Sequence, residues 1–456
     1  MSNSTEIVIC GAGIAGISTA YYLAQEHGIN SIKLIDERPP LSLTSDKSSE
    51  CYRNWWPGPG DAMVALSNRS IDLMEAIADR TGNRFNLNRR GYLYLTAQPE
   101  RIASFISTSG EISNLGAGPL RIHTGSSDDP KYIPSSLEGY KGIPDGADLF
   151  TDGGMIKEYF PYVSQNVVAA LHVRRAGWFS AQQLGMHMLN DARIRGVEVI
   201  TGRVVGVDVT KGKVTTVKLS TGERIGTSIF VNAAGPYIKQ VSELFEVDIP
   251  VFCELHLKVA IRDPSGALPR NAPLLIWSDP QILAWDQDER VFLSADQETR
   301  WLLNEFPPGG NTRPEGGLNS DIVLFLWEYQ PKIMEPIFPV PIDDEYQEIA
   351  LRGMAKMIPA LTGYIDKAPR PRIDGGYYTK THENRPLIGS LPVPGIYIIG
   401  ALLGYGLMVA CAAGELLAAH ITGSQLPKYA DTFLLQRYED PRYQSLLSSW
   451  HESGQL

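Results

Sequence analysis

The sequence lacks several features that define whole classes of protein. Its 456 residues hold 4 cysteines, none in a Cys-x-x-Cys pair, and 8 scattered histidines. A disulfide scaffold, a thiolate zinc site and an HExxH metalloprotease are therefore not expected, and so few cysteines are typical of a reducing, cytoplasmic compartment. No run of basic residues occurs, and the net charge of -10 argues against a nucleic-acid-binding protein.

Hydrophobic segments do not indicate a membrane protein. Residues 1–6 are polar and acidic rather than basic, so we expect no secretory signal. The apolar stretch 396–419 is long enough to span a bilayer, but it contains clustered glycines and Glu415. A strand, a glycine turn and a helix fit this stretch better, so no transmembrane segment is predicted.

What the sequence does contain is an α/β pattern. Residues 6–10 and 31–35 are short apolar runs, and residues 17–25 between them have helical periodicity. Strand, glycine turn, helix and strand within about thirty residues are typical of the start of a doubly wound α/β domain. Because 43% of this long chain is hydrophobic, we expect real cores and two domains.

The strongest motif is the glycine turn GAGIAG between the first strand and the first helix. Its first glycine permits the turn, its second lets backbone N–H groups approach a pyrophosphate, and its third lets the helix pack on the strand. A carboxylate at the end of the second strand would bind a ribose; Asp36 is the candidate, and Glu37 is the alternative if that strand ends one residue later. The predicted turn residues are Gly11, Ala12, Gly13, Ile14, Ala15 and Gly16.

Later segments distinguish FAD from NAD. A Ser-rich loop occupies 44–49, VNAAGP occupies 231–236, DGGYYT occupies 374–379, and a glycine-rich segment runs from 400 to 408. With these segments in this order, nearly the whole chain resembles the FAD-dependent oxidoreductases of the D-amino-acid oxidase family, the group with glycine oxidase, sarcosine oxidase and dimethylglycine dehydrogenase. That resemblance implies an α/β fold in which a Rossmann-like FAD-binding domain is interleaved with an α+β substrate domain built on an antiparallel sheet. The expected limits are 1–88, 165–246 and 366–456 for the FAD-binding domain, and 89–164 and 247–365 for the substrate-binding domain.

The resemblance also assigns residues to FAD. The glycine turn would hold the pyrophosphate, the Ser-rich loop would pass beside the isoalloxazine, and the helix that begins near 404–408 would point its N-terminus at the flavin. If this last segment binds no cofactor, it is a plain core helix. The further cofactor-binding residues implied are Asp36, Glu37, Arg38, Ser45, Lys47, Ser48, Ser49, Val204, Ala234, Gly235, Gly376, Gly404, Tyr405, Gly406, Leu407 and Met408.

Three positions depart from the family pattern. Gly376 stands where sarcosine oxidase relatives have a cysteine that carries the flavin, so non-covalent FAD is expected. Met408 replaces a lysine of those relatives, and Tyr405 replaces a histidine that is often found in the segment. These departures weaken the expectation that sarcosine is the substrate and that oxygen reacts rapidly.

Three residues are the candidates for contact with the substrate. A guanidinium fork suits a carboxylate, so Arg53 is the candidate clamp; the alternative is a surface arginine over the tryptophan pair 55–56. Tyr378 matches a family tyrosine that faces the substrate, with a core aromatic as the alternative, and Tyr405 is the third candidate. We expect no metal site.

The expected substrate domain contains residues 251–262 and 274–295, whose alternating or apolar patterns predict strands. An alternating run of polar residues lies in the first of these two stretches. Glu254, His256 and Lys258 fall on one side of a predicted strand. We interpret this side as a solvated strand face rather than as a wall of the flavin site.

The resulting functional hypothesis is a flavoenzyme that oxidises the C–N bond of an amino acid or of a secondary or tertiary amine to an imine, which water hydrolyses. An FAD-dependent 2-hydroxy acid or polyol dehydrogenase is the first alternative, since a carboxylate clamp serves both. A non-catalytic FAD-carrying subunit is the second. Oxygen, a quinone and an electron-transfer protein all remain open as the electron acceptor.

Overall fold

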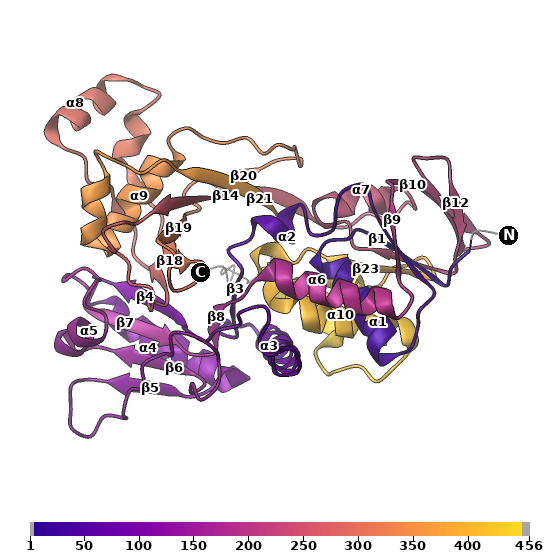
Figure 1. Cartoon of the computed structure of the whole chain (residues 1–456), viewed down its shortest axis with the longest axis horizontal. Coiled ribbons are helices and arrows are strands. Elements are labelled where there is room, and N and C mark those ends of the chain that lie inside the picture. Colours follow the sequence, from indigo (N-terminus) through magenta and orange to yellow (C-terminus); the bar gives the residue numbers. More distant parts are fainter. Residues whose placement is uncertain (1–3, 449–456) are drawn as a thin grey trace.

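The computed structural model describes residues 4–448, and two sheet-centred regions lie side by side in it (Figure 1). The region around β1, α1 and α10 occupies the right of the view, and the region around β14, β4 and β7 occupies the left. Both regions are assembled from segments far apart in the sequence, so each has to be described by its strand pairing.

The first region contains a six-stranded sheet in the order β22-β23-β13-β1-β2-β9, in which only β22 runs antiparallel to its neighbour. The central strands are short apolar runs; β1 is buried along its whole length and β23 at all residues but Tyr397, as expected for a parallel sheet covered on both faces. The strands are β1 (Ile7–Cys10), β2 (Ile32–Asp36), β9 (Glu198–Thr201), β13 (Ile229–Asn232), β22 (Leu387–Ser390) and β23 (Ile396–Gly400).

One face of this sheet is covered by four helices: α1 (Ile14–Glu26), α3 (Ala62–Thr81), α6 (Ala181–Ile194) and α10 (Gly406–Thr422). Helices α1 and α10 approach each other so closely that Gly414 has no room for a side chain. A Cβ there would lie 2.1 Å from the Ser18 hydroxyl. The segment Leu403–Thr422 is long and apolar enough to cross a membrane by length and composition, and 72% of its most apolar window is buried inside the protein. These contacts explain its hydrophobicity as that of a core helix.

The other face of the sheet carries a three-stranded antiparallel sheet and a short helix. Val8, Phe230 and Ile398 of the parallel sheet pack there in one apolar cluster with residues of these elements. The elements are β10 (Val204–Thr210), β11 (Lys213–Leu219), β12 (Arg224–Gly226) and α7 (Ile238–Glu243).

The second region is a ten-stranded mixed sheet in the order β20-β14-β19-β18-β15-β4-β7-β6-β5, with β21 also paired to β14. Its longest pairing joins β14 and β21 antiparallel, with Glu254 opposite Tyr378 and His256 opposite Gly376. The strands are β4 (Tyr92–Thr96), β5 (Leu120–His123), β6 (Ala147–Phe150), β7 (Ala169–Val173), β14 (Phe252–Arg262), β15 (Leu274–Trp277), β18 (Asn311–Glu315), β19 (Ile322–Leu326), β20 (Lys332–Ile333) and β21 (Arg372–Lys380).

Smaller elements complete the described chain. Two small antiparallel pairs join β3 (Cys51–Arg53) to β8 (Ala176–Trp178) and β16 (Gln281–Ile282) to β17 (Glu305–Phe306). The remaining helices are α2 (Thr44–Lys47), α4 (Arg101–Ile112), α5 (Gly153–Tyr159), α8 (Gln287–Ala295), α9 (Tyr346–Met357) and α11 (Pro441–Ser448).

One sequence-based expectation needs correction. The apolar residues of 274–295 predict strands throughout, yet α8 occupies the last part, because Asp286 and Glu289 form a capping box at its N-terminus. The domain division stays a prediction, but its expected limits divide the ten-stranded sheet. Strands β7 and β21 pair in that sheet, although 165–246 and 366–456 are assigned to the FAD-binding domain.

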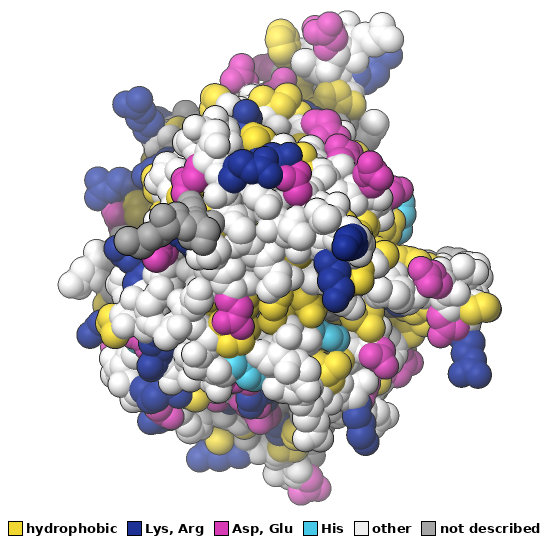
Figure 2. Space-filling model, turned by 90° about the vertical axis from the view of Figure 1, so that its right-hand side faces the viewer, with side chains coloured by type: hydrophobic (Ala, Val, Ile, Leu, Met, Phe, Trp, Pro, Cys, Tyr) yellow, Lys and Arg dark blue, Asp and Glu magenta, His cyan; other side chains and the backbone are white. Residues whose placement is uncertain are grey.

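The surface bears charges of both signs. On the face drawn in Figure 2, lysine and arginine side chains are interspersed with aspartate and glutamate. That mixed pattern differs from the clustered basic face of a nucleic-acid-binding protein.

Candidate active site

The turn between β1 and α1 requires its glycines for two different reasons. Gly11 has φ +112°, and a Cβ there would lie 2.3 Å from the Ala233 carbonyl oxygen; a Cβ at Gly16 would lie 2.0 Å from the Gly11 carbonyl oxygen. These two glycines are therefore needed for backbone packing. A Cβ at Gly13 would meet only the Ser45 hydroxyl, at 3.5 Å, and Gly13 lines two cavities. Its missing side chain leaves space for a ligand rather than for the protein.

The first cavity, of about 550 Å³, lies at the carboxyl ends of β1 and β2. Asp36 ends β2, and its carboxylate accepts hydrogen bonds from the backbone N–H groups of Ala12 (2.8 Å) and Arg38 (2.9 Å). Glu37 is exposed and lies 4.0 Å from Arg203, at the rim. Of the predicted cofactor residues, this cavity is lined by Gly11, Gly13, Asp36, Glu37, Arg38, Ser45, Val204, Ala234 and Gly235.

The N-terminus of α1 stands between this cavity and a second one. The Ile14 N–H donates to the Ser45 hydroxyl at 3.1 Å, and Gly13 and Ser45 line both cavities. The free N–H groups and the positive dipole end of a helix favour a phosphate at this point. The two joined cavities with a helix N-terminus between them therefore fit an extended dinucleotide, with its pyrophosphate at α1.

The second cavity, of about 110 Å³, lies between α1, α2, β21 and the start of α10. Lys47 forms ion pairs with Asp46 (2.8 Å) and Asp374 (3.0 Å), and a Cβ at Gly376 would lie 3.1 Å from that of Lys47. Strand β21 and α2 therefore enclose a narrow slot. Of the predicted residues, it is lined by Gly13, Ile14, Ala15, Ser45, Lys47, Ser48, Gly235, Gly376, Tyr378, Gly404, Gly406 and Leu407.

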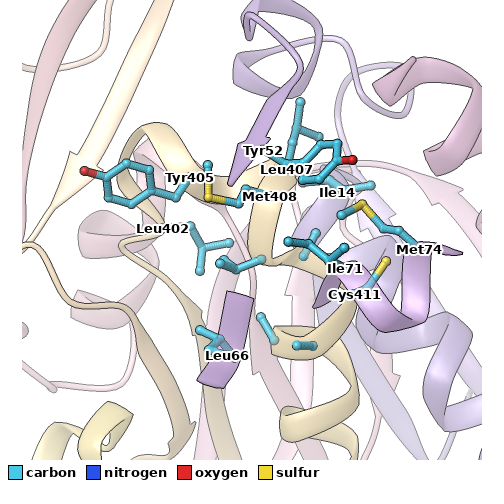
Figure 3. Packing of buried hydrophobic residues seen from close by; sticks show 14 of the residues in the cluster. Ile14, Tyr52, Leu66, Ile71, Met74, Leu402, Tyr405, Leu407, Met408 and Cys411 are labelled. Carbon is cyan, nitrogen blue, oxygen red and sulfur yellow. The ribbon is translucent and has the colours of Figure 1, made fainter. Parts of the chain in front are cut away.

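The late glycine-rich segment is both a core helix and a wall of this slot. A Cβ at Gly404 would lie 2.5 Å from the Tyr378 ring, so only glycine fits there. Figure 3 shows Leu407 and Cys411 of α10 in the packed core with Ile71 and Met74 of α3, whereas Tyr405 points away from it. The alternatives of core helix and cofactor helix thus describe two ends of the same element.

A third cavity, of about 370 Å³, adjoins the slot and holds the three predicted substrate-contacting residues. Arg53 is buried, its Nη1 donates to the Tyr94 hydroxyl at 2.5 Å, and its guanidinium lies 4.9 Å from the Trp56 ring centre. The tryptophan stack expected for a surface arginine is therefore present, but inside the protein and at the cavity wall. Ser49 and Met408 line the same cavity.

Tyr378 and Tyr405 present phenols to this cavity. Burial raises the pKa of both hydroxyls well above the usual value, so both stay protonated and can donate hydrogen bonds at neutral pH. Tyr405 meets the Trp56 ring edge to face at 4.2 Å. Next to Arg53 the cavity thus combines a cation with neutral donors, which suits a carboxylate. The rest of its lining carries charges of both signs, on Lys332, Lys380, Glu254, Glu328 and Asp343.

The interpretation of Glu254, His256 and Lys258 as a solvated strand face is wrong. The side chains of Glu254 and His256 are 9% and 10% exposed, and His256 and Lys258 line the narrow slot. The alternation correctly places the three residues on one face of β14. That face is covered by the loop after α2, which lies close in space although it is two hundred residues away in sequence.

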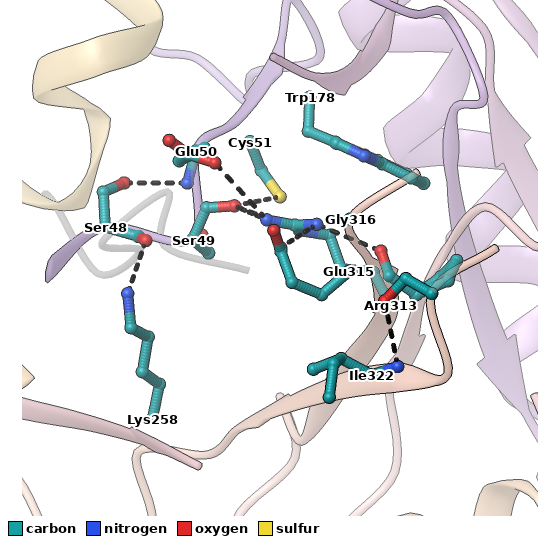
Figure 4. Close-up of polar contacts among 12 residues, drawn as sticks. Ser48, Ser49, Glu50, Cys51, Trp178, Lys258, Arg313, Glu315, Gly316 and Ile322 are labelled. Atoms are coloured by element: carbon teal, nitrogen blue, oxygen red, sulfur yellow. Dashed lines mark hydrogen bonds and ion pairs between the residues drawn. The ribbon is translucent and has the colours of Figure 1, made fainter. Parts of the chain in front are cut away.

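Two cations hold this loop, the half-buried Lys258 and the buried Arg313, as Figure 4 shows. The Lys258 ammonium donates to the Ser48 carbonyl oxygen at 2.8 Å, and Arg313 donates to the Ser49 carbonyl oxygen at 3.0 and 2.7 Å. Burial lowers the pKa of Lys258. Sequence reasoning missed Arg313, because no local pattern relates a residue of β18 to the loop before β3.

Two predicted residues have structural rather than lining positions. The N–H of Ala12 is bonded to Asp36, and Gly16 packs on Gly11. All other predicted cofactor residues line one of the three cavities.

Comparison with known proteins agrees with this geometry. Human mitochondrial dimethylglycine dehydrogenase is 23% identical over 435 residues, which cover 92% of this chain and 43% of that protein. The chain thus spans less than half of that relative's length. Among solved structures, L-proline dehydrogenase from P. horikoshii (TM-score 0.72, 20% identity) and glycine oxidase from Geobacillus kaustophilus (TM-score 0.72, 14% identity) each match over 96% of this chain and 99% of their own.

A family profile covers most of the chain as well. The profile described as FAD dependent oxidoreductase (DAO) matches residues 6–420, from the strand before the glycine turn to the end of α10. The chain therefore belongs to the DAO family of FAD-dependent oxidoreductases, with FAD as its cofactor.

Proposed function

We propose that this flavoenzyme oxidises the C–N bond of an amino acid or of a secondary or tertiary amine that carries a carboxylate. The observation that carries the proposal is the 370 Å³ cavity with Arg53 in its wall, which shares Tyr378 and Gly404 with the slot beside α10. A carboxylate held by Arg53 would leave the adjacent carbon and nitrogen near that shared boundary.

The chain's own residues would act mainly by positioning. When bound, FAD supplies a two-electron acceptor for the hydrogen on the carbon next to nitrogen. Arg53, Tyr378 and Tyr405 would hold the substrate in one orientation, and the surrounding apolar walls would exclude water. The oxidised product is an imine, which water hydrolyses after release. The names of the relatives, which are a dimethylglycine dehydrogenase, a proline dehydrogenase and a glycine oxidase, support the amine class.

Three accompanying features belong to the same proposal. FAD would be bound without a covalent link at β21, because Gly376 offers no nucleophile. The electron acceptor would be oxygen, a quinone or an electron-transfer protein. A cytoplasmic location is supported by four free, buried cysteines.

The test is anaerobic mixing of the FAD-loaded protein with glycine derivatives, N-methyl amino acids, D- and L-amino acids, and 2-hydroxy acids. Loss of the long-wavelength flavin absorbance with an amine is the expected result, and readmission of air then separates an oxidase from a dehydrogenase. Reduction by hydroxy acids alone would replace the proposal with the alcohol-oxidising alternative. Reduction by none of them would favour a structural flavin.

A further inference from the structure

A histidine and a glutamate meet in the wall between the narrow slot and the 370 Å³ cavity that Arg53 lines. His256, on β14, lines both the slot and the Arg53 cavity, and Glu328, which follows β19, lines the Arg53 cavity. The His256 Nε2 lies 2.6 Å from a Glu328 carboxylate oxygen and 3.4 Å from one of Glu254. Two carboxylates at one ring nitrogen require it to carry the hydrogen, so the neutral ring keeps Nδ1 as a proton acceptor.

The ring is held firmly in place. It stacks on the Tyr378 ring with centres 3.6 Å apart and planes 22° apart. The backbone beneath it is fixed by the β14–β21 ladder, and the adjacent Leu257 carbonyl accepts a hydrogen bond from the Tyr346 hydroxyl at 2.5 Å. A histidine held between a tyrosine and a carboxylate has the geometry of an oriented base.

The surrounding charges separate the roles of the two glutamates. The Lys380 ammonium lies 2.7 Å from Glu254. Burial alone would raise the pKa of Glu254, but hydrogen bonds from His256 and Lys380 lower that pKa to about 2. Glu254 is therefore neutralised by Lys380. One oxygen each of Glu254 and Glu328 and one His256 nitrogen lie within 4.8 Å of one another, but that bound ammonium competes with a metal ion. Further ionisable groups line the two cavities that His256 shares: Arg53, Lys258, Lys332, Asp343, Lys47, Tyr329, Tyr346, Tyr378 and Tyr405.

We propose that His256 is the proton acceptor for the substrate ammonium and that Glu328 is its positioning residue. The inference rests on the proposed function, because an amine needs a free lone pair before its carbon can be oxidised. The N–H bond of the ammonium breaks, its electron pair stays on nitrogen, and the proton binds Nδ1 of His256. The imidazolium that forms is stabilised by Glu328. After oxidation the proton leaves to solvent.

The test is the pH dependence of anaerobic flavin reduction by the amine found in the panel. In the wild type, the rate should level off well below the substrate's own pKa, which for an alkyl amine lies near 10. In His256→Gln the rate should fall about 100-fold at pH 7 and keep rising up to the pKa of the amine. In Glu328→Gln, which keeps the His256 ring, the rate at pH 7 should fall about 10-fold. His187→Gln on α6, outside the three cavities, is the matched control and should behave as wild type.

Binding of trimethylglycine, followed by the flavin spectrum, gives a readout without turnover. Its nitrogen has no hydrogen to lose, so its Kd should be unchanged by His256→Gln. A Kd raised as much as the rate is lowered would make His256 a mere contact, and an unchanged pH profile in His256→Gln would overturn the inference alone. If His256→Gln loses FAD, the pH profile of Glu328→Gln takes its place as the test. A wild-type pH profile in Glu328→Gln would then overturn the inference. If no amine reduces the wild type, the proposed function and the inference fall together.

Discussion

The cofactor cavities and the substrate cavity are built in opposite ways. The 550 Å³ cavity is centred on one strand–turn–helix unit, with further walls from residues around 202–205 and 233–244. Its key features are backbone N–H groups and missing side chains. The substrate cavity uses side chains from β3, β14, β21 and the start of α10, which come together only in the folded chain.

Buried charge also differs between the two sheets. In the six-stranded sheet the central strand β1 is entirely apolar and buried, and a buried ion pair, Glu383 with Arg437, lies at the edge beside β22. In and around the ten-stranded sheet, Asp148, Arg174, Arg313 and Arg352 are at most 5% exposed and are held by ion pairs. A binding site made from backbone geometry tolerates sequence change outside its turn, whereas a site made from paired side chains depends on every partner.

The largest effect is expected at Gly13, in the cofactor site that is built from backbone groups. Gly13→Val should abolish FAD retention, because the side chain would fill the space that the turn leaves for the pyrophosphate. The protein should still fold, since a Cβ there meets only the Ser45 hydroxyl at 3.5 Å. FAD content after purification and the circular dichroism of the apoprotein measure the two outcomes.

A matched control for this substitution is Gly110→Val in α4, where a Cβ has open space. The control should retain FAD. Full FAD occupancy in Gly13→Val would contradict the placement of the pyrophosphate and remove the contrast between the two sites.

The substitution Arg53→Met tests the substrate cavity, the site that is built from side chains. It should raise the Kd of simple carboxylic acids about 100-fold, because a charge-assisted hydrogen-bonded pair contributes about 1.5–3 kcal/mol. FAD content should stay normal, since Arg53 lines the substrate cavity and not the slot. Flavin absorbance titrations measure the Kd, and Arg262→Met, at an exposed ion pair, is the control. An unchanged Kd would leave Arg53 a purely structural neighbour of Trp56.

The same contrast explains what could be predicted from the sequence. The turn and Asp36 are local, and their roles follow from spacing along the chain, whereas the role of Ser45 was implied by the family resemblance. The strand alternation of Glu254, His256 and Lys258 fixes a shared face but not what covers it, and that uncertainty made the solvated interpretation wrong. Arg313 and Glu328 have no local signal, because their partners lie on distant strands. The helix α8 did have one, the Asp286–Glu289 capping box, which the apolar residues around it masked.

Acid should affect the two regions at different pH values. Asp148 on β6 is 1% exposed and is bonded to Arg121, His123 and Arg174 at 2.7–2.9 Å. Burial alone would raise the pKa of Asp148, but these three partners lower that pKa to about 2. A carboxyl whose pKa is lower in the folded state stabilises above its unfolded pKa near 3.9 and loses that contribution as the pH falls toward 2, about 2 kcal/mol in all.

Hydrogen exchange of β6 and β7, corrected for its intrinsic pH dependence, follows the ten-stranded region, and flavin release follows the cofactor region. Tryptophan fluorescence would mix the two regions, because Trp55, Trp56 and Trp178 pack in the other apolar cluster. Between pH 5 and 2 the exchange signal should change first. Asp148→Asn should lower the stability at pH 7 by about 2 kcal/mol and flatten its acid dependence, because the neutral amide has no charge to lose. If both signals change together in the wild type and in the variant, the two regions unfold as one cooperative unit, and the difference in buried charge has no separate consequence for stability.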